Sequence, residues 1–202
     1  MVLLAIESSS SSVSVAILSD QKVLGYRWEK MERGQGEALI PLIQSLLAEL
    51  NLDIQAITAV AVAVGPGSFT GVRVALSTAR AIGLALNVPV MGVTNFEIAA
   101  FDLPKPLTVV LDTKRGDYYT QFLDETGNVI GEAVVLDNDA LKKRLPFVAV
   151  GDGAEKLKEE IGCAVLEQLN APAVCVGKIA LKRLNHPLSA EPFYLRGADV
   201  SL

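Results

Sequence analysis

The chain has 202 residues, of which 50% are hydrophobic, and it carries a formal net charge of -5. A chain of this size can bury one large or two small cores, and its charge excludes a global basic field that attracts nucleic acid. Residues 1–6 lack a basic region, and the longest apolar run elsewhere, 56–64, is well short of the ~20 residues of a membrane span. We therefore expect a soluble, cytoplasmic protein without a membrane segment.

The first half of the sequence predicts three strands, a helix, a strand, a glycine turn and a second helix. The apolar pattern at 2–6, 13–18 and 23–28 is typical of a three-stranded meander, and a helix then runs to about Leu50. A buried strand, 60–64, is ended by Gly65-Pro66-Gly67, and Ser68 or Thr70 can cap the helix that follows. That helix, about Gly71 to Leu86, is apolar or small nearly all the way round, so we expect it to face the core or a partner subunit.

The second half repeats this order after the proline-rich linker 103–106. Strands are predicted at 107–111, 118–123 and 129–136, a helix at 139–145, a strand at 147–150, then a glycine turn and a helix at 154–161. An internal structural repeat is the economical explanation. It predicts two domains, at 1–103 and 104–202.

An acidic turn follows the first strand of each half. Glu7 precedes Ser8 and Ser9 in one half, and Asp112 precedes Thr113 in the other. A carboxylate at the end of a buried strand can hold Mg²⁺ through water, with nearby N–H groups facing phosphate. The alternative is that both are hydrogen-bonded structural turns. The two cysteines, Cys163 and Cys175, and the single His186 are too scattered for a disulfide framework or a zinc site.

The duplicated meander with acidic turns resembles the actin, sugar kinase and Hsp70 superfamily, which implies an α/β fold with two ribonuclease H-like lobes. Residues 3–9, 65–73 and 192–196 resemble the bacterial TsaB (YeaZ) family. The resemblance runs from residue 1 to about 200 and is weakest between 136 and 187. It implies a non-catalytic subunit of the machinery that makes threonylcarbamoyladenosine in tRNA. The family pairs with a catalytic paralogue, TsaD, and with the ATPase TsaE.

The resemblance also makes expectations for individual residues. The family usually has Asp where this chain has Glu7, which changes the reach of the carboxylate. The two histidines of the TsaD metal motif fall on Asn95 and Ala99, so we expect neither a metal site nor a catalytic residue. ATP or ADP with Mg²⁺ is expected at most at a site shared within the complex. The residues of such a vestigial nucleotide site would be Glu7, Ser8, Ser9, Asp112, Gly151 and Gly153.

The resemblance places the partner interface on two helices, 37–50 and 71–86, which would pack against the matching pair of TsaD. The predicted contact residues are Leu39, Ile43, Leu46, Val72, Leu76, Ala79 and Ile82. Transfer RNA would be met only through the complex. Two alternatives stay open. A homodimer could use the same helices, and a small ATPase or phosphotransferase could use Glu7, Asp112 and 151–153.

Overall fold

The computed structural model describes residues 1–144, 148–160, 162 and 164–195. The chain divides into two compact units, each with its own sheet. The first comprises Met1–Ile98 and Asn170–Pro192, and the second comprises the described residues of Ala99–Leu169 together with 193–195. The predicted assignment of all of 104–202 to one lobe is therefore wrong. The chain returns to the first sheet at Asn170 and packs a helix on it.

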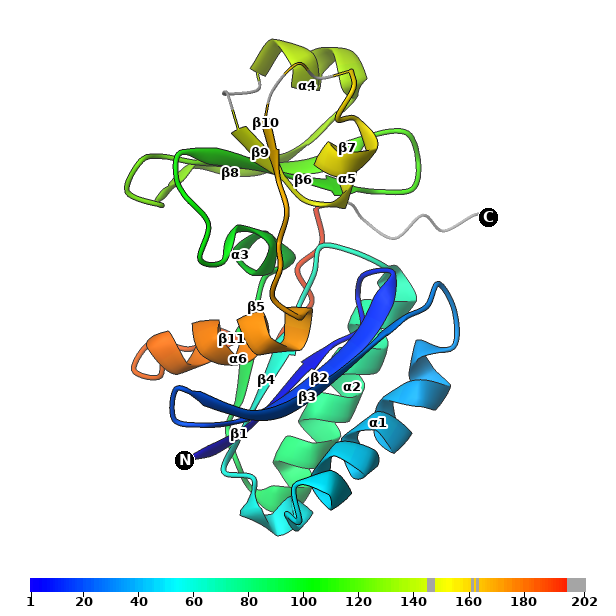
Figure 1. Ribbon diagram of the computed structural model, residues 1–202, viewed down its shortest axis with the longest axis vertical. Helices are drawn as coiled ribbons and strands as arrows, with labels where there is room; N and C mark the ends of the chain where they lie inside the picture. Colours follow the sequence, from blue (N-terminus) through cyan, green and yellow to red (C-terminus); the bar gives the residue numbers. More distant parts are fainter. Residues whose placement is uncertain (145–147, 161, 163, 196–202) are drawn as a thin grey trace. The chain divides into compact units, whose positions relative to one another are not determined.

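The first unit is built on a six-stranded sheet with the order β11-β5-β4-β1-β2-β3 (Figure 1). Strands β1, β2 and β3 form the predicted antiparallel meander, β4 and β5 run parallel to β1, and β11 pairs antiparallel to β5. The strands are β1 (Val2–Glu7), β2 (Ser12–Ser19), β3 (Lys22–Lys30), β4 (Ala59–Ala63), β5 (Val90–Val93) and β11 (Leu188–Ser189).

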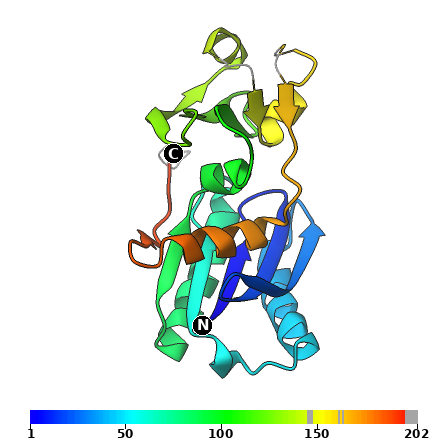
Figure 2. The ribbon, with the colours of Figure 1, turned by 60° about the vertical axis from the view of Figure 1, so that its left-hand side comes forward.

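Helices cover both faces of this sheet, with α1 (Gln35–Glu49) and α2 (Phe69–Leu86) on one face and α6 (Pro172–Lys182) on the other (Figures 1 and 2). A Cβ at Gly25 of β3 would meet Leu46 of α1 at 3.0 Å, whereas one at Gly177 of α6 would meet Leu18 of β2 at 2.4 Å. Two short helices complete the unit's connections, η1 (Ile54–Ala56) and α3 (Asn95–Ala100), the second of which spans the division between the units.

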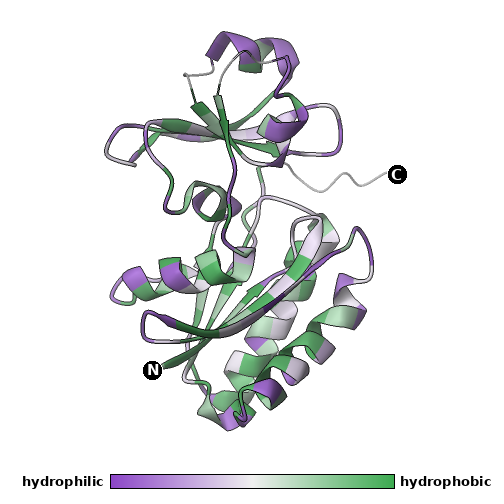
Figure 3. Cartoon of the chain, in the orientation of Figure 1, coloured by the Kyte–Doolittle hydropathy of each residue, from purple (hydrophilic) through white to green (hydrophobic). Residues whose placement is uncertain are grey.

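Within the described part of the chain, α2 is the helix with the length and hydropathy that a membrane span needs. Its inner side is buried against β4 of the same sheet through Val72, Ala75 and Ala79. Arg80 of this helix donates from Nε to the carbonyl oxygen of Ala190 at 3.1 Å. These contacts are those of a helix that covers a sheet. Hydrophobic colour extends over much of α2 in Figure 3, whereas α4 (Asn138–Arg144) of the second unit is mostly hydrophilic.

The second unit repeats the topology of the first, with the sheet order β10-β9-β6-β7-β8. Strands β6, β7 and β8 form an antiparallel meander, and β9 and β10 continue the sheet in parallel. The strands are β6 (Leu107–Asp112), β7 (Tyr118–Leu123), β8 (Val129–Leu136), β9 (Val148–Val150) and β10 (Ala164–Leu166). The helices are α4 (Asn138–Arg144) and α5 (Asp152–Lys156). The predicted internal repeat is confirmed.

The cores of the two units are separate. The second is a cluster that includes Val110, Tyr118, Leu141 and Ala154, contributed by strands and by both helices. Cys175 is buried in the first unit. Cys163 and the predicted positions Leu145, Phe147, Ile161 and Arg196 lie outside the described residues.

Candidate functional site

The Glu7 carboxylate is the polar centre of the first unit, and its residue is only 1% exposed. Oε1 accepts hydrogen bonds from Ser9 N–H at 2.6 Å, Ser9 Oγ at 2.8 Å and Ser10 N–H at 2.9 Å, and Oε2 accepts one from Ser10 Oγ at 2.9 Å. Burial raises the pKa of Glu7 above its ordinary 4.5, and the Ser9 and Ser10 hydrogen bonds oppose that rise. Glu7 therefore holds its own turn, and both oxygens are in use.

The turn held by Glu7 lies directly under the glycine loop. Ser68 N–H donates to the carbonyl oxygen of Ser9 at 2.8 Å, and Ser8 Oγ donates to the carbonyl oxygen of Gly71 at 2.9 Å. A Cβ at Gly67 would lie 2.4 Å from the Ser9 carbonyl oxygen, and one at Gly71 would lie 2.0 Å from that of Ser8. The glycines are required because the two backbones touch. The loop is thus the structural turn that its spacing predicts.

Ser68 and Asn95 fix the two ends of this loop. Ser68 Oγ accepts the N–H of Gly71 at 3.2 Å and caps α2, which confirms one of the two predicted capping residues. Asn95 donates from Nδ2 to Ser9 Oγ and to the carbonyl oxygen of Pro66, both at 2.8 Å. Asn95 therefore ties α3, the Glu7 turn and the glycine loop together, a role that sequence reasoning missed because it depends on three distant segments.

The carboxylate in the acidic turn of the second unit is also bonded to neighbouring side-chain and main-chain groups. Asp112 accepts hydrogen bonds from Lys114 N–H at 2.8 Å and from Lys156 Nζ at 3.2 Å, and Lys114 Nζ lies 3.3 Å from Oδ2. Burial opposes ionisation of Asp112, but the Lys114 N–H and the Lys156 and Lys114 ammonium groups outweigh it. The pKa of Asp112 consequently lies below its ordinary 3.8.

The second-unit glycines are also explained by packing. A Cβ at Gly151 would lie 2.3 Å from the Val110 carbonyl oxygen, and one at Gly153 would lie 2.6 Å from the Tyr118 ring. Both allow α5 to approach β6 closely. The structure brings Asp112, Gly151 and Gly153 together, and in the other unit it brings Glu7, Ser8 and Ser9 together. In neither group is a carboxylate left open, so these residues do not fit a Mg²⁺–nucleotide site within either unit.

The residues predicted to contact the partner are not on the surface of the protein, so this part of the prediction is wrong. Leu39, Ile43 and Leu46 of α1 and Val72, Leu76 and Ala79 of α2 are buried in the first unit's own core, and Ile82 is half-buried. The physical reason is that the hydrophobic spacing of a helix marks the face with the most apolar area, and the chain's own sheet covers that face. Any partner must meet the opposite face.

The outward face of α2 is a continuous stripe of exposed residues at helical spacing. It comprises Phe69, Arg73, Ser77, Ala81 and Leu84. Leu84 is 85% exposed, and the Arg73 guanidinium stacks over the Phe69 ring at 3.2 Å from its centroid. Helix α1 packs against α2, and its Ile40 is also exposed. We call these six residues the outer helix face.

A hollow of about 620 Å³ lies where α1 and α2 begin. It is lined by residues 32–37 together with Ser68, Thr70 and Val74. Gly34, the residue before α1, has a φ of 92° and its helix has no side-chain cap. The hollow thus lies at the beginnings of the two helices that carry the outer helix face, although none of the six residues of that face lines it.

Comparisons with known proteins decide the family. The sequence profile described as TsaD, tRNA N6-adenosine threonylcarbamoyltransferase, matches residues 15–182. The tRNA threonylcarbamoyladenosine biosynthesis protein TsaB of Bacillus subtilis is 28% identical over 163 residues, covering 79% of this chain and 67% of that protein. The chain belongs to the TsaB (YeaZ) family. An uncharacterised Mycobacterium bovis protein is 30% identical over 198 residues, 97% of this chain and 92% of its own length.

A solved structure supports the TsaB-family fold. A Pseudomonas aeruginosa protein described as similar to the peptidase YeaZ superposes with a TM-score of 0.79 at 23% identity, over 96% of this chain and 99% of that chain. The two α/β units, each with a meander continued by parallel strands, confirm the predicted fold class. Among the described residues, no group of three or more His, Cys, Asp or Glu side chains could hold a metal ion. Asn95 and Ala99, the positions that the resemblance matches to the TsaD metal histidines, lie in α3.

Proposed function

We propose that this chain is a non-catalytic subunit in the biosynthesis of threonylcarbamoyladenosine in tRNA, and that it binds a TsaD-type catalytic paralogue. The family assignment and the names of its relatives support the pathway. Asn95 occupies a metal-histidine position but supports a loop, and the Glu7 and Asp112 carboxylates are bonded to their own turns. These contacts support a structural role for the residues that a catalytic relative would use in chemistry.

The outer helix face is the observation that carries the interface. Leu84 at 85% exposure is a large apolar side chain in a row with Ala81 and Phe69. Small and apolar residues let a second helix pair approach closely, and buried aromatic and aliphatic anchors dominate binding energy. A subunit that binds only one conformation of its partner shifts the partner's population toward that conformation. Activation of the paralogue therefore needs no catalytic group from this chain.

A matched pair of leucine variants tests this interface. Leu84→Glu places an uncompensated charge within the proposed contact, whereas Leu169→Glu changes an equally exposed leucine, 83% exposed, in the second unit. Mixed with the paralogue and analysed by size-exclusion chromatography with light scattering, Leu84→Glu should weaken the complex at least tenfold. Leu169→Glu should assemble as the wild type does. Wild-type assembly by a folded Leu84→Glu variant contradicts the interface.

Mg-ATP titration of the isolated chain tests the alternative of a small ATPase or phosphotransferase. Because both acidic turns are occupied by their own hydrogen bonds, we expect no Mg²⁺-dependent nucleotide binding at millimolar concentration. A homodimer and the paralogue complex would share the outer helix face. Leu84→Glu should then weaken the homodimer as well, and the TsaE-type ATPase can be added to either species to locate its contact.

A further inference from the structure

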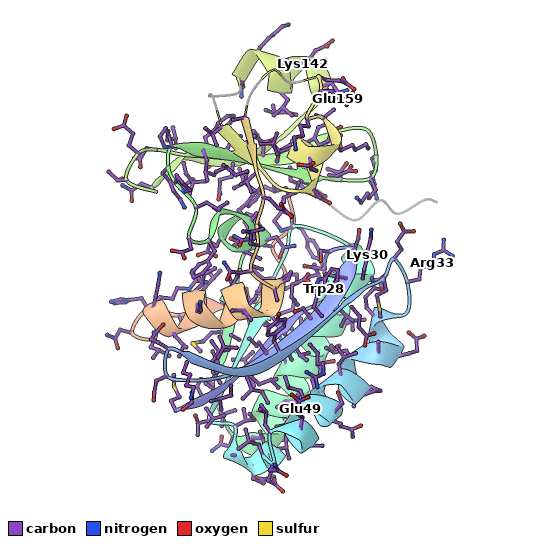
Figure 4. The ribbon with its side chains drawn as sticks, viewed as in Figure 1. Trp28, Lys30, Arg33, Glu49, Lys142 and Glu159 are labelled. Atoms are coloured by element: carbon purple, nitrogen blue, oxygen red, sulfur yellow. The ribbon has the colours of Figure 1, made fainter. Side chains whose placement is uncertain are left out.

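Strand β3 forms one edge of the first unit's sheet, and no described strand pairs with its outer side. It has nine residues, whereas β11 at the opposite edge has two. Natural sheets usually protect their edges with short strands, prolines or bulges. Tyr26 and Trp28 of β3 are 51% and 48% exposed, and Trp28 and Lys30 lie along the strand in Figure 4. A long edge with exposed aromatic rings is typical of a strand that pairs with another chain.

Alternate residues of β3 present their main-chain groups to this edge. Met31 N–H donates to the carbonyl oxygen of Ser11 at 3.2 Å, so these two residues are a hydrogen-bonded pair of the β2–β3 ladder. In an antiparallel ladder such pairs alternate with pairs that exchange no hydrogen bond. The register of β3 on β2 therefore turns the N–H and C=O groups of Tyr26, Trp28 and Lys30 away from β2. These groups are available to an added strand.

The regular part of β3 is centred on Trp28. The register shifts by one residue beyond Gly25, which leaves Leu24 in a bulge. At the other end, the ladder continues to Met31. The regular segment thus runs from 25 to 31, and its midpoint is residue 28. An antiparallel copy of the same segment, with its own Trp28 opposite, would pair with it over its full length.

The two sides of β3 carry different side chains. Arg27 forms an ion pair with Glu49 of α1, so it lies on the side that α1 covers, and Glu29 shares that side by the alternation of the strand. The three residues with outward main-chain groups lie on the opposite side. Arg27 Nη1 also donates to the carbonyl oxygen of Tyr26 at 3.0 Å. A carbonyl oxygen can accept two hydrogen bonds, so this contact leaves room for a second donor.

We propose that two copies of this chain pair antiparallel through β3, with the two-fold axis at Trp28. In this register the Trp28 rings of the two copies face each other, and Tyr26 of each copy faces Lys30 of the other. On the α1 side, Arg27 of each copy faces Glu29 of the other, at the closer, non-hydrogen-bonded position of the ladder. Aromatic, cation–π and opposite-charge pairs therefore coincide in a single register.

Charge selects this register over its neighbours. A slide of two residues keeps the hydrogen-bond alternation, but it places Arg27 opposite Arg27 in one direction and Glu29 opposite Glu29 in the other. A slide of one residue breaks the alternation. Two-fold symmetry repeats each favourable pair, so the pattern that complements β3 is carried by β3 itself. This self-complementarity is the reason to assign the edge to a second copy rather than to an unrelated strand.

The β3 pairing and the outer helix face are separate surfaces, because β3 contributes no residue to that face. The inference therefore goes beyond the proposed function and does not depend on it. A copy that is paired through β3 keeps Phe69 and Leu84 outside the strand contact, so these side chains remain available to the paralogue. The pairing is also distinct from a homodimer through the outer helix face.

Exchange of charge between two positions tests the register. The parent for these measurements is the full chain with Leu84→Glu, which removes a homodimer through the outer helix face, and self-association is followed by analytical ultracentrifugation. Strand pairing buries less area than a standard interface, so we expect a dissociation constant of about 10 to 100 μM. Arg27→Glu and Glu29→Arg should each weaken the dimer about tenfold, because symmetry repeats the like-charge contact. The double variant should restore the affinity of the parent.

Glu49→Gln is the matched control, since it removes the ion pair of Arg27 within the chain without changing the edge. It should dimerise as the parent does. The side chains of Arg27 and Glu49 are 39% and 50% exposed, so circular dichroism should show the same fold for every variant.

Three results would overturn the inference. They are a parent that is monomeric at about 1 mM, single charge variants that associate as the parent does, and a double variant that fails to regain affinity. If the single variants, in a chain that keeps Leu84, change assembly with the paralogue but not self-association, β3 accepts a strand of the paralogue and the inference is wrong. The comparison of Leu84→Glu with Leu169→Glu is scored separately, so a failure here is distinguishable from a failure of the proposed function.

Discussion

At the residue scale, Glu7 shows how one buried carboxylate can be structural in a position that resembles a nucleotide-binding turn. The side chain satisfies two backbone N–H groups and two hydroxyl groups of residues 9 and 10. Removing it would leave buried donors unpaired, which costs far more than a typical exposed substitution. The extra methylene relative to aspartate is compatible with this role, because the carboxylate reaches over its own turn.

Glu7→Gln should alter the pH dependence of stability more than stability itself. Oε1 of glutamine can keep three of the four hydrogen bonds, and its amide can donate to Ser10 Oγ instead. Because the folded-state pKa of Glu7 is raised, its contribution to stability is fully present below 4.5 and is lost as pH rises through the folded pKa. The wild type should therefore lose stability with rising pH above 4.5, and the variant should lose less. Denaturant titrations across pH measure both.

Glu7→Ala is the companion to that variant. It should destabilise the chain by about 2 to 4 kcal/mol, since it removes every acceptor at once. If Glu7→Gln and Glu7→Ala have the same stability and the same pH profile, the carboxylate does not organise the turn.

Gly71→Ala should be strongly destabilising because the new Cβ would lie 2.0 Å from the Ser8 carbonyl oxygen. Gly36→Ala is the matched control, since its Cβ would lie 3.7 Å from a Val74 methyl group, an ordinary contact. We expect a loss of about 3 kcal/mol for Gly71→Ala and a change within about 1 kcal/mol for Gly36→Ala. Thermal unfolding followed by circular dichroism compares them. Similar melting temperatures for the two variants contradict the close approach.

At the element scale, α2 has two apolar sides, of which one is buried in the core and the other is exposed. Both sides of this helix are rich in small and apolar residues, so its sequence left the orientation open. Contact with β4 settles it, burying Val72, Ala75 and Ala79 and leaving Phe69 and Leu84 outside. The hydrophobic side chains at highest exposure are thus absent from the predicted interface residues, although they lie on the predicted helices.

Arginine substitutions at two neighbouring alanines separate the inner from the outer side of α2. Ala79 is fully buried, so Ala79→Arg should prevent stable folding by inserting a charge into the core. Ala81 is exposed, so Ala81→Arg should fold normally and weaken binding of the paralogue. Circular dichroism and light scattering give the two readouts. A well-folded Ala79→Arg variant contradicts the orientation of the helix.

At the scale of the whole molecule, the repeat explains the architecture but not the path of the chain. Each unit is a meander followed by parallel strands and helices, and the five equivalent strands have the same order in both sheets. Residues 170–192 break the symmetry, because α6 returns to the first sheet and buries Val174, Cys175 and Val176 there. Sequence reasoning missed α6, although Pro172 at its first turn and the spacing of its apolar residues could have indicated a helix.

Gly177→Leu should destabilise the first unit even though it follows the second unit in the sequence. A Cβ there would lie 2.4 Å from Leu18 Cδ1, so a larger side chain forces α6 off β2. Amide hydrogen exchange should increase in β1 and β2 and stay unchanged in β6 and β7, because the two units have separate cores. Lys178→Leu, at the neighbouring half-buried position, is the control. Equal loss of protection in both units contradicts the division.

The sequence by itself determined the alternation of elements, the internal repeat and the family, since these depend on local periodicity, glycine turns and motif residues. It also narrowed the cap of α2 to Ser68 or Thr70, and it located the acidic turns after the first strand of each half. Only the tertiary structure decided which side of α1 and α2 is free, where α6 packs and what Glu7, Asn95 and Asp112 contact. Those properties arise from residues that are distant in the chain, and the geometry of such contacts is not encoded in any local pattern.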